Sequence, residues 1–331
     1  MKKLMFLSLA LICLMQACKE SDDSYLGIHD TQASTTLVAT GSWIRKADIR
    51  SSRDYSVGFS IGNKGYVGTG AYDGSSTNEF WEYDSVSDSW TQKADFAGGA
   101  RTAAVGFSIG NMGYIGTGYN GENRGTHLKD FWQYNPVKNC WTRKADFKGL
   151  ARRSAVGLSI GNKGYIGTGL DSVTDKSDFW EYNPETNSWV QKADFPGRAR
   201  GGAKGFTIGN KGYLGTGFSA GLGTNEDHKD FWEYNPATDS WTRKADFGGF
   251  ERRDAASFSI DGFGYIGTGY GNSGKFLKDL WEYNPLSDSW VQKPDLPGEP
   301  RLAATGLNIG TKGYIGFGTD NNKDFWQFTR D

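Results

Sequence analysis

Six arginines occupy equivalent places along the chain, and the characteristic chemistry of arginine is the binding of anions. Each one precedes the glycine of a repeated Gly-Tyr pair by 12 residues. A guanidinium group holds a carboxylate or phosphate through two parallel hydrogen bonds, so a ring of such groups could form an anion site at the mouth of a central channel. The residues are Arg53, Arg101, Arg152, Arg200, Arg252 and Arg301. In the structural alternative, each arginine pairs with a repeated acid such as Asp130, Asp230 or Asp279. Strict repetition favours that alternative, because binding sites usually break symmetry.

Two further arginines and several aromatic residues break the repetition. Arg153 and Arg253 follow the repeated arginine in only two copies, and pairing within the repeat explains them less well. Tyr119, Phe218 and Tyr270 stand at the start of predicted loops, and Tyr72 lies one place later in its own loop. Aromatic side chains there could stack on a sugar ring or clamp a peptide, and equally they could cover the ends of the sheets.

Few residues suit other kinds of chemistry. The chain has three histidines and three cysteines. No Ser-His-Asp pattern, phosphate loop or zinc-ligand spacing is found, and we assign no catalytic residue, metal or cofactor. Carboxylates in the variable loops are the remaining candidates for acid–base work: Asp171, Asp175, Glu226, Asp227 and Glu122. The net charge of −1 gives no basic excess for nucleic-acid binding.

A repeat must position these residues. The heptad Lys-Gly-Tyr-Ile-Gly-Thr-Gly at 163–169 has near copies at 64–70, 112–118, 211–217, 263–269 and 312–318. Each repeat contains four segments rich in small, β-branched or aromatic residues, joined by tight turns, which predicts a four-stranded antiparallel sheet. Such a sheet buries both faces only when it stacks against copies of itself.

The count of strands predicts how the repeats close. The first three strands occur six times, and six fourth strands carry a tryptophan: Trp43, Trp90, Trp141, Trp189, Trp241 and Trp290. The strand near Trp43 precedes the first repeat, and none follows the last. We therefore predict an all-β, six-bladed propeller over 42–331, closed when the strand near Trp43 completes the C-terminal blade.

One end of this propeller is predicted to vary. In an antiparallel meander, the connections between strands two and three lie at the same end as the links between blades. These connections carry all the length variation, at 70–79, 118–130, 169–178, 217–230, 269–279 and 318–324. A rigid scaffold with one variable loop face is typical of binding proteins.

The repeat resembles the kelch family. The matching features are the arginine before strand one, Gly-Tyr-Ile-Gly-x-Gly in strand two, Trp-x-Tyr-Asn-Pro in strand three and the tryptophan of strand four. Strand two ends in Gly-Thr-Gly where the family usually has a Gly-Gly pair. The resemblance implies a β-propeller. Some members are copper oxidases of the galactose oxidase kind, which use histidine, tyrosine and cysteine ligands. His29, His127, His228 and Cys140 do not match that set. Others are sugar mutarotases of the sialic acid type, which implies a role for loop carboxylates.

The N-terminus predicts export and lipidation. Lys2 and Lys3 precede a short apolar run, and the Cys18 that follows resembles a bacterial lipobox. We expect a signal peptide at 1–17, lipidated Cys18 at the start of a tether over 18–41, and location at the outer membrane.

These observations together predict a monomeric, lipid-anchored binding module of the cell envelope. It is expected to recognise a protein or a glycan on the variable loop face and to contact the membrane only through its lipid. The expected ligand contacts are the six repeated arginines with Tyr119, Phe218 and Tyr270. The alternative is a sugar mutarotase or epimerase that uses loop carboxylates on the same face.

Overall fold

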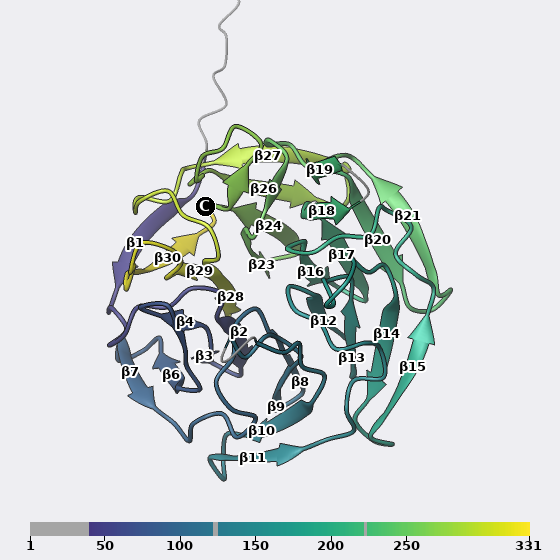
Figure 1. The fold of residues 1–331 in the computed structure, drawn as a ribbon. Helices are drawn as coiled ribbons and strands as arrows, with labels where there is room; N and C mark the ends of the chain where they lie inside the picture. The colour runs from purple at the N-terminus through teal and green to yellow at the C-terminus, as the bar shows by residue number, and fades with distance from the viewer. Residues whose placement is uncertain (1–39, 122–124, 222–223) are drawn as a thin grey trace, which may run out of the picture. The chain divides into compact units, whose positions relative to one another are not determined.

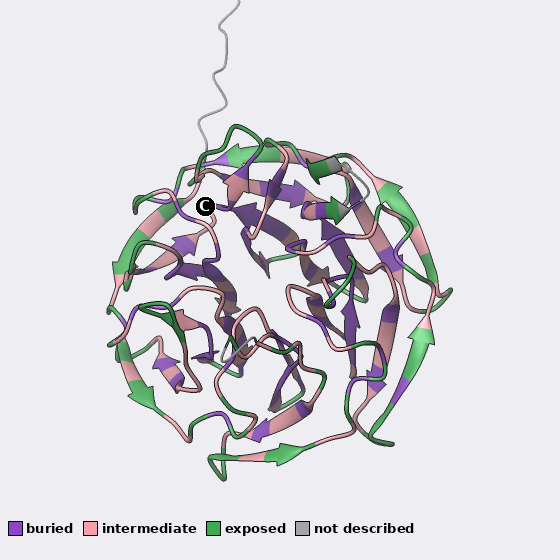
Figure 2. Cartoon of the chain, viewed as in Figure 1, coloured by how far each residue is buried: buried purple, intermediate pink, exposed green. Residues whose placement is uncertain are grey.

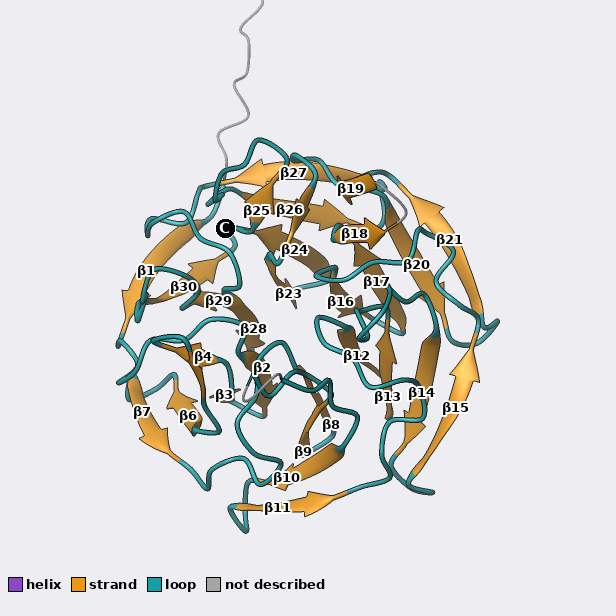
Figure 3. Cartoon of the chain, viewed as in Figure 1, coloured by secondary structure: helices purple, strands orange, loops and turns teal. Residues whose placement is uncertain are grey.

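Six four-stranded antiparallel sheets surround a central axis in the computed structural model of the protein (Figures 1 and 3). The structure describes residues 40–121, 125–221 and 224–331. These residues form strands and loops, and none of them forms a helix long and apolar enough to span a bilayer. The predicted all-β, six-bladed propeller is confirmed. The expected signal peptide 1–17, Cys18 and nearly all of the 18–41 tether lie outside the described residues.

The strands follow the predicted meander in every blade. The first, innermost strands are β2 (Val57–Ile61), β8 (Val105–Ile109), β12 (Val156–Ile160), β16 (Lys204–Ile208), β23 (Ala256–Ile260) and β28 (Thr305–Ile309). The second strands are β3 (Lys64–Gly68), β9 (Met112–Gly116), β13 (Lys163–Gly167), β17 (Lys211–Gly215), β24 (Phe263–Gly267) and β29 (Lys312–Gly316). The third strands are β6 (Phe80–Asp84), β10 (Phe131–Asn135), β14 (Phe179–Asn183), β20 (Phe231–Asn235), β26 (Leu280–Asn284) and β30 (Phe325–Thr329). The fourth, outermost strands are β7 (Ser89–Gln92), β11 (Cys140–Arg143), β15 (Ser188–Lys192), β21 (Ser240–Lys244), β27 (Ser289–Lys293) and β1 (Ser42–Lys46).

Burial decreases from the axis outward (Figure 2). The second strands are buried along almost their whole length, whereas the fourth strands are largely exposed. The repeated glycine of strand two permits the close stacking of blades: a Cβ at Gly164 would lie 2.4 Å from the ring of Phe107 in the preceding blade. The repeated heptad is thus conserved within the chain because each blade must offer its neighbour the same packing surface.

Strand β1 closes the ring as predicted. It pairs antiparallel with β30, with Ser42 opposite Thr329 and Lys46 opposite Phe325. Each tryptophan of a fourth strand donates its indole N–H to a carbonyl of the preceding blade, as Trp90 does to Ala47 at 2.9 Å. Trp43 makes the equivalent bond to Pro294, also at 2.9 Å. The N-terminal strand therefore matches the other fourth strands in its pairing with strand three and in its indole hydrogen bond to the preceding blade.

The two ends of the propeller differ. We call the end with the short connections between strands one and two, and between three and four, the turn face. The opposite end is the loop face, and its longer connections add the short strands β4 (Ala71–Tyr72), β5 (Ser75–Ser76), β18 (Phe218–Gly221), β19 (Thr224–Asp227), β22 (Arg252–Arg253) and β25 (Tyr270–Gly271). Because β1 runs antiparallel to β30, the chain enters β1 from the turn face.

Candidate functional site

The six repeated arginines are buried within their blades. Each is no more than 1% exposed. Arg152 is representative: its two terminal nitrogens donate to the two carboxylate oxygens of Asp178 at 2.6 and 2.7 Å, and further bonds reach the carbonyls of Thr168 and Leu150. Its guanidinium also lies 4.9 Å from the ring centre of Phe147. The same pairing joins Arg101 to Asp130, Arg200 to Asp230, Arg252 to Asp279 and Arg301 to Asp324.

These pairs are the structural alternative considered from the sequence. The guanidinium donors of Arg152 are already used by its own blade, so they offer nothing to an external anion. Burial alone would raise the pKa of Asp178, but its hydrogen bonds from Arg152 and the arginine's charge outweigh burial and hold that pKa below the usual value. The five arginine–aspartate pairs therefore belong to the scaffold, and we leave these arginines out of the proposed site.

Arg53 differs from the other five because its partner is Glu79 rather than an aspartate. One terminal nitrogen donates to Glu79 and to Ser51, at 3.0 and 2.9 Å, while Nε and Nη1 are buried with no partner among the described residues. Desolvation lowers the pKa of Arg53 to about 10, although the charge of Glu79 opposes this effect. The side chain lies in blade 1 and does not line the axial channel described next.

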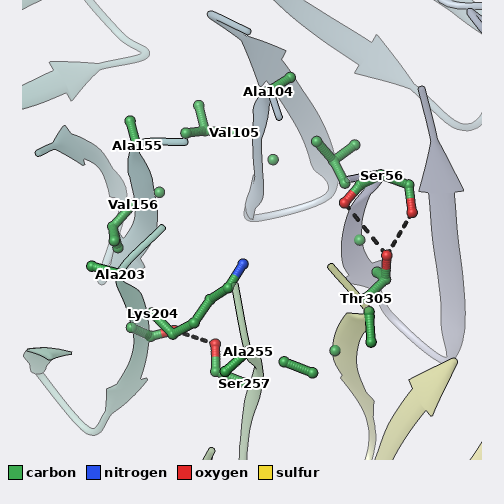
Figure 4. Close-up of a pocket in the computed structure, with 18 residues that line it drawn as sticks. Ser56, Ala104, Val105, Ala155, Val156, Ala203, Lys204, Ala255, Ser257 and Thr305 are labelled. Atoms are coloured by element: carbon green, nitrogen blue, oxygen red, sulfur yellow. Dashed lines mark hydrogen bonds between the residues drawn. The ribbon is translucent and has the colours of Figure 1, made fainter. Parts of the chain in front are cut away.

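The central channel is a funnel that opens on the loop face. Its widest part, which we call the axial pocket, has a volume of about 430 Å³ and is lined by residues that include Arg153, Asp175, Phe218 and Arg253. A neck of about 40 Å³ follows, and then an inner channel of about 150 Å³ lined by the first strands of all six blades (Figure 4). Neighbouring sections share lining residues, so the three cavities follow one another along the axis.

A closed circle of backbone hydrogen bonds forms the neck. The residue two places after each repeated arginine donates its N–H to the carbonyl of the equivalent residue in the preceding blade, over 2.8–3.2 Å. All six residues have a left-handed backbone, with φ between 49° and 64°. They are Tyr55, Ala103, Ser154, Gly202, Asp254 and Ala303. Five of them are not glycine, so the fold tolerates an unfavourable conformation to complete the circle.

The neck and inner channel are chemically asymmetric. Four of the six neck residues are Ala, Ser or Gly, whereas Tyr55 and Asp254 carry polar groups that line both the neck and the axial pocket. At the first position of the innermost strand, five blades have Val, Ala or Thr and the fourth has Lys204. Figure 4 shows the amine of Lys204 in the open centre of the channel.

Lys204 and Asp254 influence each other across neighbouring blades. Desolvation lowers the pKa of Lys204 and raises the pKa of Asp254, and the opposite charge of each partner works against these shifts. The Asp254 carboxylate accepts a long hydrogen bond of 3.4 Å from the Tyr55 hydroxyl. It lies directly over Gly202, where an added Cβ would be 2.7 Å from Asp254 Oδ1. Both groups face the passage rather than the surrounding protein core.

The two non-repeated arginines stand at the axial pocket and are held by aromatic rings. The guanidinium of Arg153 lies 5.0 Å from the ring centre of Tyr119, and that of Arg253 lies 4.3 and 4.6 Å from Phe218 and Tyr270. These are the three aromatic residues predicted as ligand contacts. Phe218 itself lines the pocket, whereas Tyr119 and Tyr270 contribute by stacking on the arginines.

The two arginines differ in their ionic partners. Arg253 forms an ion pair with Asp227 at 2.9 Å. For Arg153 the described residues provide no ion pair and no hydrogen bond to the guanidinium group. Stacking on Tyr119 therefore fixes this cation in position while its donors stay available to a ligand.

The predicted loop carboxylates do not converge. Asp171 pairs with Lys176 at 2.7 Å, Asp227 pairs with Arg253, and Glu226 pairs with Arg198 at 2.9 Å. Asp175 alone of this set lines the axial pocket, where desolvation raises its pKa although it accepts a 2.6 Å bond from the N–H of Ala220. Glu122 lies outside the described residues.

The two histidines on the loop face lie apart from any metal-like cluster. His228 is hydrogen-bonded to Ser219 at 2.7 Å, and the ring of His127 lies 5.3 Å from that of Tyr119. Across 40–121, 125–221 and 224–331, no group of three or more His, Cys, Asp or Glu side chains is arranged to hold a metal ion.

Sequence reasoning missed Tyr55, Lys204 and Asp254. The residues before the innermost strand were assigned only to the sheet. Comparing the six copies in register shows all three exceptions: the second blade has Thr-Ala-Ala-Val where the first has Asp-Tyr-Ser-Val, the fourth Gly-Gly-Ala-Lys and the fifth Arg-Asp-Ala-Ala. The unequal pairing of Arg153 and Arg253 could not be found this way, since it depends on the conformation of the 217–230 loop.

Comparison with known proteins agrees with this architecture. The model of the Kelch motif family matches residues 118–148. A solved structure described as "Structure of YjhT" is similar over 85% of this chain and 95% of that chain, with 16% identity and a TM-score of 0.72. No curated protein matches the chain in sequence. These findings show a kelch motif at 118–148, within a four-stranded unit that the chain repeats in six blades, and a β-propeller fold like that of the matched structure.

Proposed function

We propose that the protein is a lipid-anchored binding module of the cell envelope that recognises a carboxylate-bearing glycan in the axial pocket. A kelch propeller fold is compatible with binding or with catalysis, so the proposal depends on the site itself. The observation that carries it is the Arg153 guanidinium, which faces the pocket, is fixed by Tyr119 and has no carboxylate partner among the described residues. A ligand carboxylate supplies the missing partner.

The shape and lining of the pocket favour a sugar. A volume of about 430 Å³ lies at the small end of ligand pockets and suits one or two sugar rings better than a folded protein surface. Phe218, Leu170 and the edge of Tyr55 provide apolar contact, while Ser154, Thr102 and Asp175 offer hydroxyl and carboxylate groups. Such a mixture matches the alternating apolar faces and hydroxyl groups of a sugar ring.

Replacing Arg153 by alanine is expected to weaken the binding of an acidic sugar by about tenfold or more, because a hydrogen-bonded charge pair is lost. The probe is methyl β-D-glucuronide, and the measurement is saturation-transfer NMR followed by titration calorimetry. Arg143→Ala is the matched control. Arg143, on the exposed outermost strand β11, likewise lies over an aromatic ring, that of Trp132 at 6.0 Å, but its guanidinium pairs with Asp146. Equal binding by the two variants would contradict the role of Arg153, whereas no binding by the unaltered protein would make an acidic protein segment the leading ligand.

A sugar mutarotase or epimerase is the second candidate. Asp175 and Asp254 both line the axial pocket, and desolvation raises the pKa of each, which shifts both toward the acid form that can donate a proton. Exchange NMR on reducing sugars distinguishes the candidates. Accelerated interconversion of anomers that is lost in Asp254→Asn would favour the enzyme, whereas binding without exchange favours the module.

The lipid anchor is tested separately. Cys18→Ser is expected to move the protein from the membrane fraction to the soluble fraction of cells and to abolish incorporation of labelled palmitate. Cys140→Ser is the matched control, because Cys140 is an exposed free cysteine on β11. Membrane retention of the Cys18→Ser protein would contradict lipidation at this residue.

A further inference from the structure

The amine of Lys204 is the single basic group among the residues that line the inner channel and the neck. Its equivalents in the other five blades are Val57, Val105, Val156, Ala256 and Thr305. Packing alone gives no reason for a lysine here, since small and β-branched residues fill the same place in every other blade. A single departure from the repeat at the axis indicates a chemical role.

Lys204 is half-buried and lacks a partner. Among the described residues its amine makes neither a hydrogen bond nor an ion pair. Lys293, in contrast, is buried and pairs with Glu282 at 3.2 Å. Because the Lys204 amine faces the open channel, a group entering along the axis can satisfy it.

The surroundings favour the neutral, nucleophilic form of this amine. The groups that face it are Asp254 from the fifth blade and, through Asp254, the hydroxyl of Tyr55 from the first and the guanidinium of Arg253. Desolvation lowers the pKa of Lys204, and an uncharged amine in a desolvated site is the form that attacks carbonyl carbons. Desolvation raises the pKa of Asp254, the carboxyl group of the neighbouring blade, which shifts it toward the acid form that can donate a proton.

We propose that Lys204 captures the open-chain carbonyl of a reducing acidic sugar as a reversible imine. The inference rests on the proposed function, which places the ligand's carboxylate at Arg153 and its opposite end toward the neck. The axial pocket and the neck share Tyr55 and Asp254, so a ligand held in the pocket has its inner end directed at the channel that contains Lys204.

The chemistry balances without any other reactant. The lone pair of the Lys204 nitrogen forms a C–N bond to the carbonyl carbon, and a proton moves from nitrogen to oxygen to give a carbinolamine. Asp254 then donates a proton to the departing hydroxyl group, water leaves, and the nitrogen returns a proton to Asp254 as the C=N bond forms. Hydrolysis runs the same steps backward and restores the free sugar and the amine.

Reductive trapping of the intact protein tests the proposal. D-glucuronate and sodium cyanoborohydride are added at neutral pH, and labelled lysines are quantified by peptide mapping and mass spectrometry. Lys204 is expected to react faster than Lys138, an exposed lysine at the tip of the β10–β11 turn, because the bound sugar is directed at the channel and desolvation lowers the pKa of Lys204. Excess methyl β-D-glucuronide is expected to protect Lys204 and not Lys138, and Lys204→Met removes the selective label.

The outcomes separate this inference from the proposed function. Methyl β-D-glucuronide carries the carboxylate but has no aldehyde in equilibrium, so its binding tests only the acidic-ligand proposal. If it binds and Lys204 is labelled no faster than Lys138, carbonyl capture is overturned and the binding module stands. If Lys204 is labelled selectively by D-glucose as well as D-glucuronate while the methyl glycoside does not bind, capture is supported and the acidic ligand is wrong.

Discussion

Replacing Asp178 by alanine is expected to reduce the free energy of unfolding by about 3 kcal/mol, because it leaves the guanidinium of Arg152 buried without its counter-charge. Arg152 is fully buried and donates two hydrogen bonds to this carboxylate, and the indole of Trp180 donates a third at 2.7 Å. Urea denaturation followed by tryptophan fluorescence measures the change.

The matched control is Asp146→Ala, which removes an ion pair of similar length from the surface. Arg143 and Asp146 lie 3.0 Å apart, but their side chains are 59% and 41% exposed. Water screens such a pair, so its loss is expected to cost no more than about 0.5 kcal/mol. Equal effects of the two substitutions would show that the buried pair stabilises its blade no more than a surface pair does.

The pH dependence provides a second readout of the same pair. Arg152 holds the pKa of Asp178 below its usual value. The ionised carboxylate therefore stabilises the fold at pH values above its unfolded pKa of about 3.9, and this contribution is lost as the pH falls through the lower folded value. The difference in stability between the native protein and Asp178→Asn should be full at pH 7 and shrink below about pH 4.

Replacing Trp43 by alanine is expected to destabilise the protein by about 3 kcal/mol, because this side chain closes the ring. Its indole packs 5.1 Å from the ring of Phe328 and bonds to the carbonyl of Pro294, so one substitution weakens a contact across the β1–β30 seam and a contact to the preceding blade. Thermal unfolding, together with hydrogen exchange in β30 and β29, measures the loss.

Ile44→Ala on the same strand is the control for Trp43. The Ile44 side chain is 53% exposed, and its loss should change stability by no more than about 0.5 kcal/mol. If Trp43→Ala leaves exchange in β30 unaltered, the N-terminal strand contributes little to closure and the last blade is stable with three strands.

The repeated sequence made the propeller scaffold predictable, whereas the candidate site is formed by residues that depart from the repeat. Six heptads, one Ser-Trp segment before the first repeat and none after the last were enough to predict six blades and closure by β1. The repeated arginines were also best explained by their repetition: Arg152 and its equivalents found partners at the same place in each blade. Local sequence was sufficient to predict these pairs because equivalent residues make equivalent contacts in every blade.

The arrangement of the site could not be predicted from the sequence. The sequence shows that Lys204 and Asp254 are unusual, but it does not show that a circle of backbone hydrogen bonds brings six distant segments to one neck. Nor does it show that Asp227 reaches Arg253 while Arg153 keeps its donors available within the described residues. Both outcomes depend on how loops of unequal length fold back over the same face, which no local pattern specifies.

Strand β1 also determines how the protein bears mechanical load. The chain enters this strand from the turn face, at the end where Ser42 faces Thr329. Thr329 lies at the same end of the ladder, so tension between the two ends of the propeller chain acts on this first pair and opens the ladder one pair at a time, instead of shearing five pairs together. The seam that completes the ring is thus its mechanical weak point, and a pull strong enough to peel β1 away would open the last blade while the other five retain their own fourth strands.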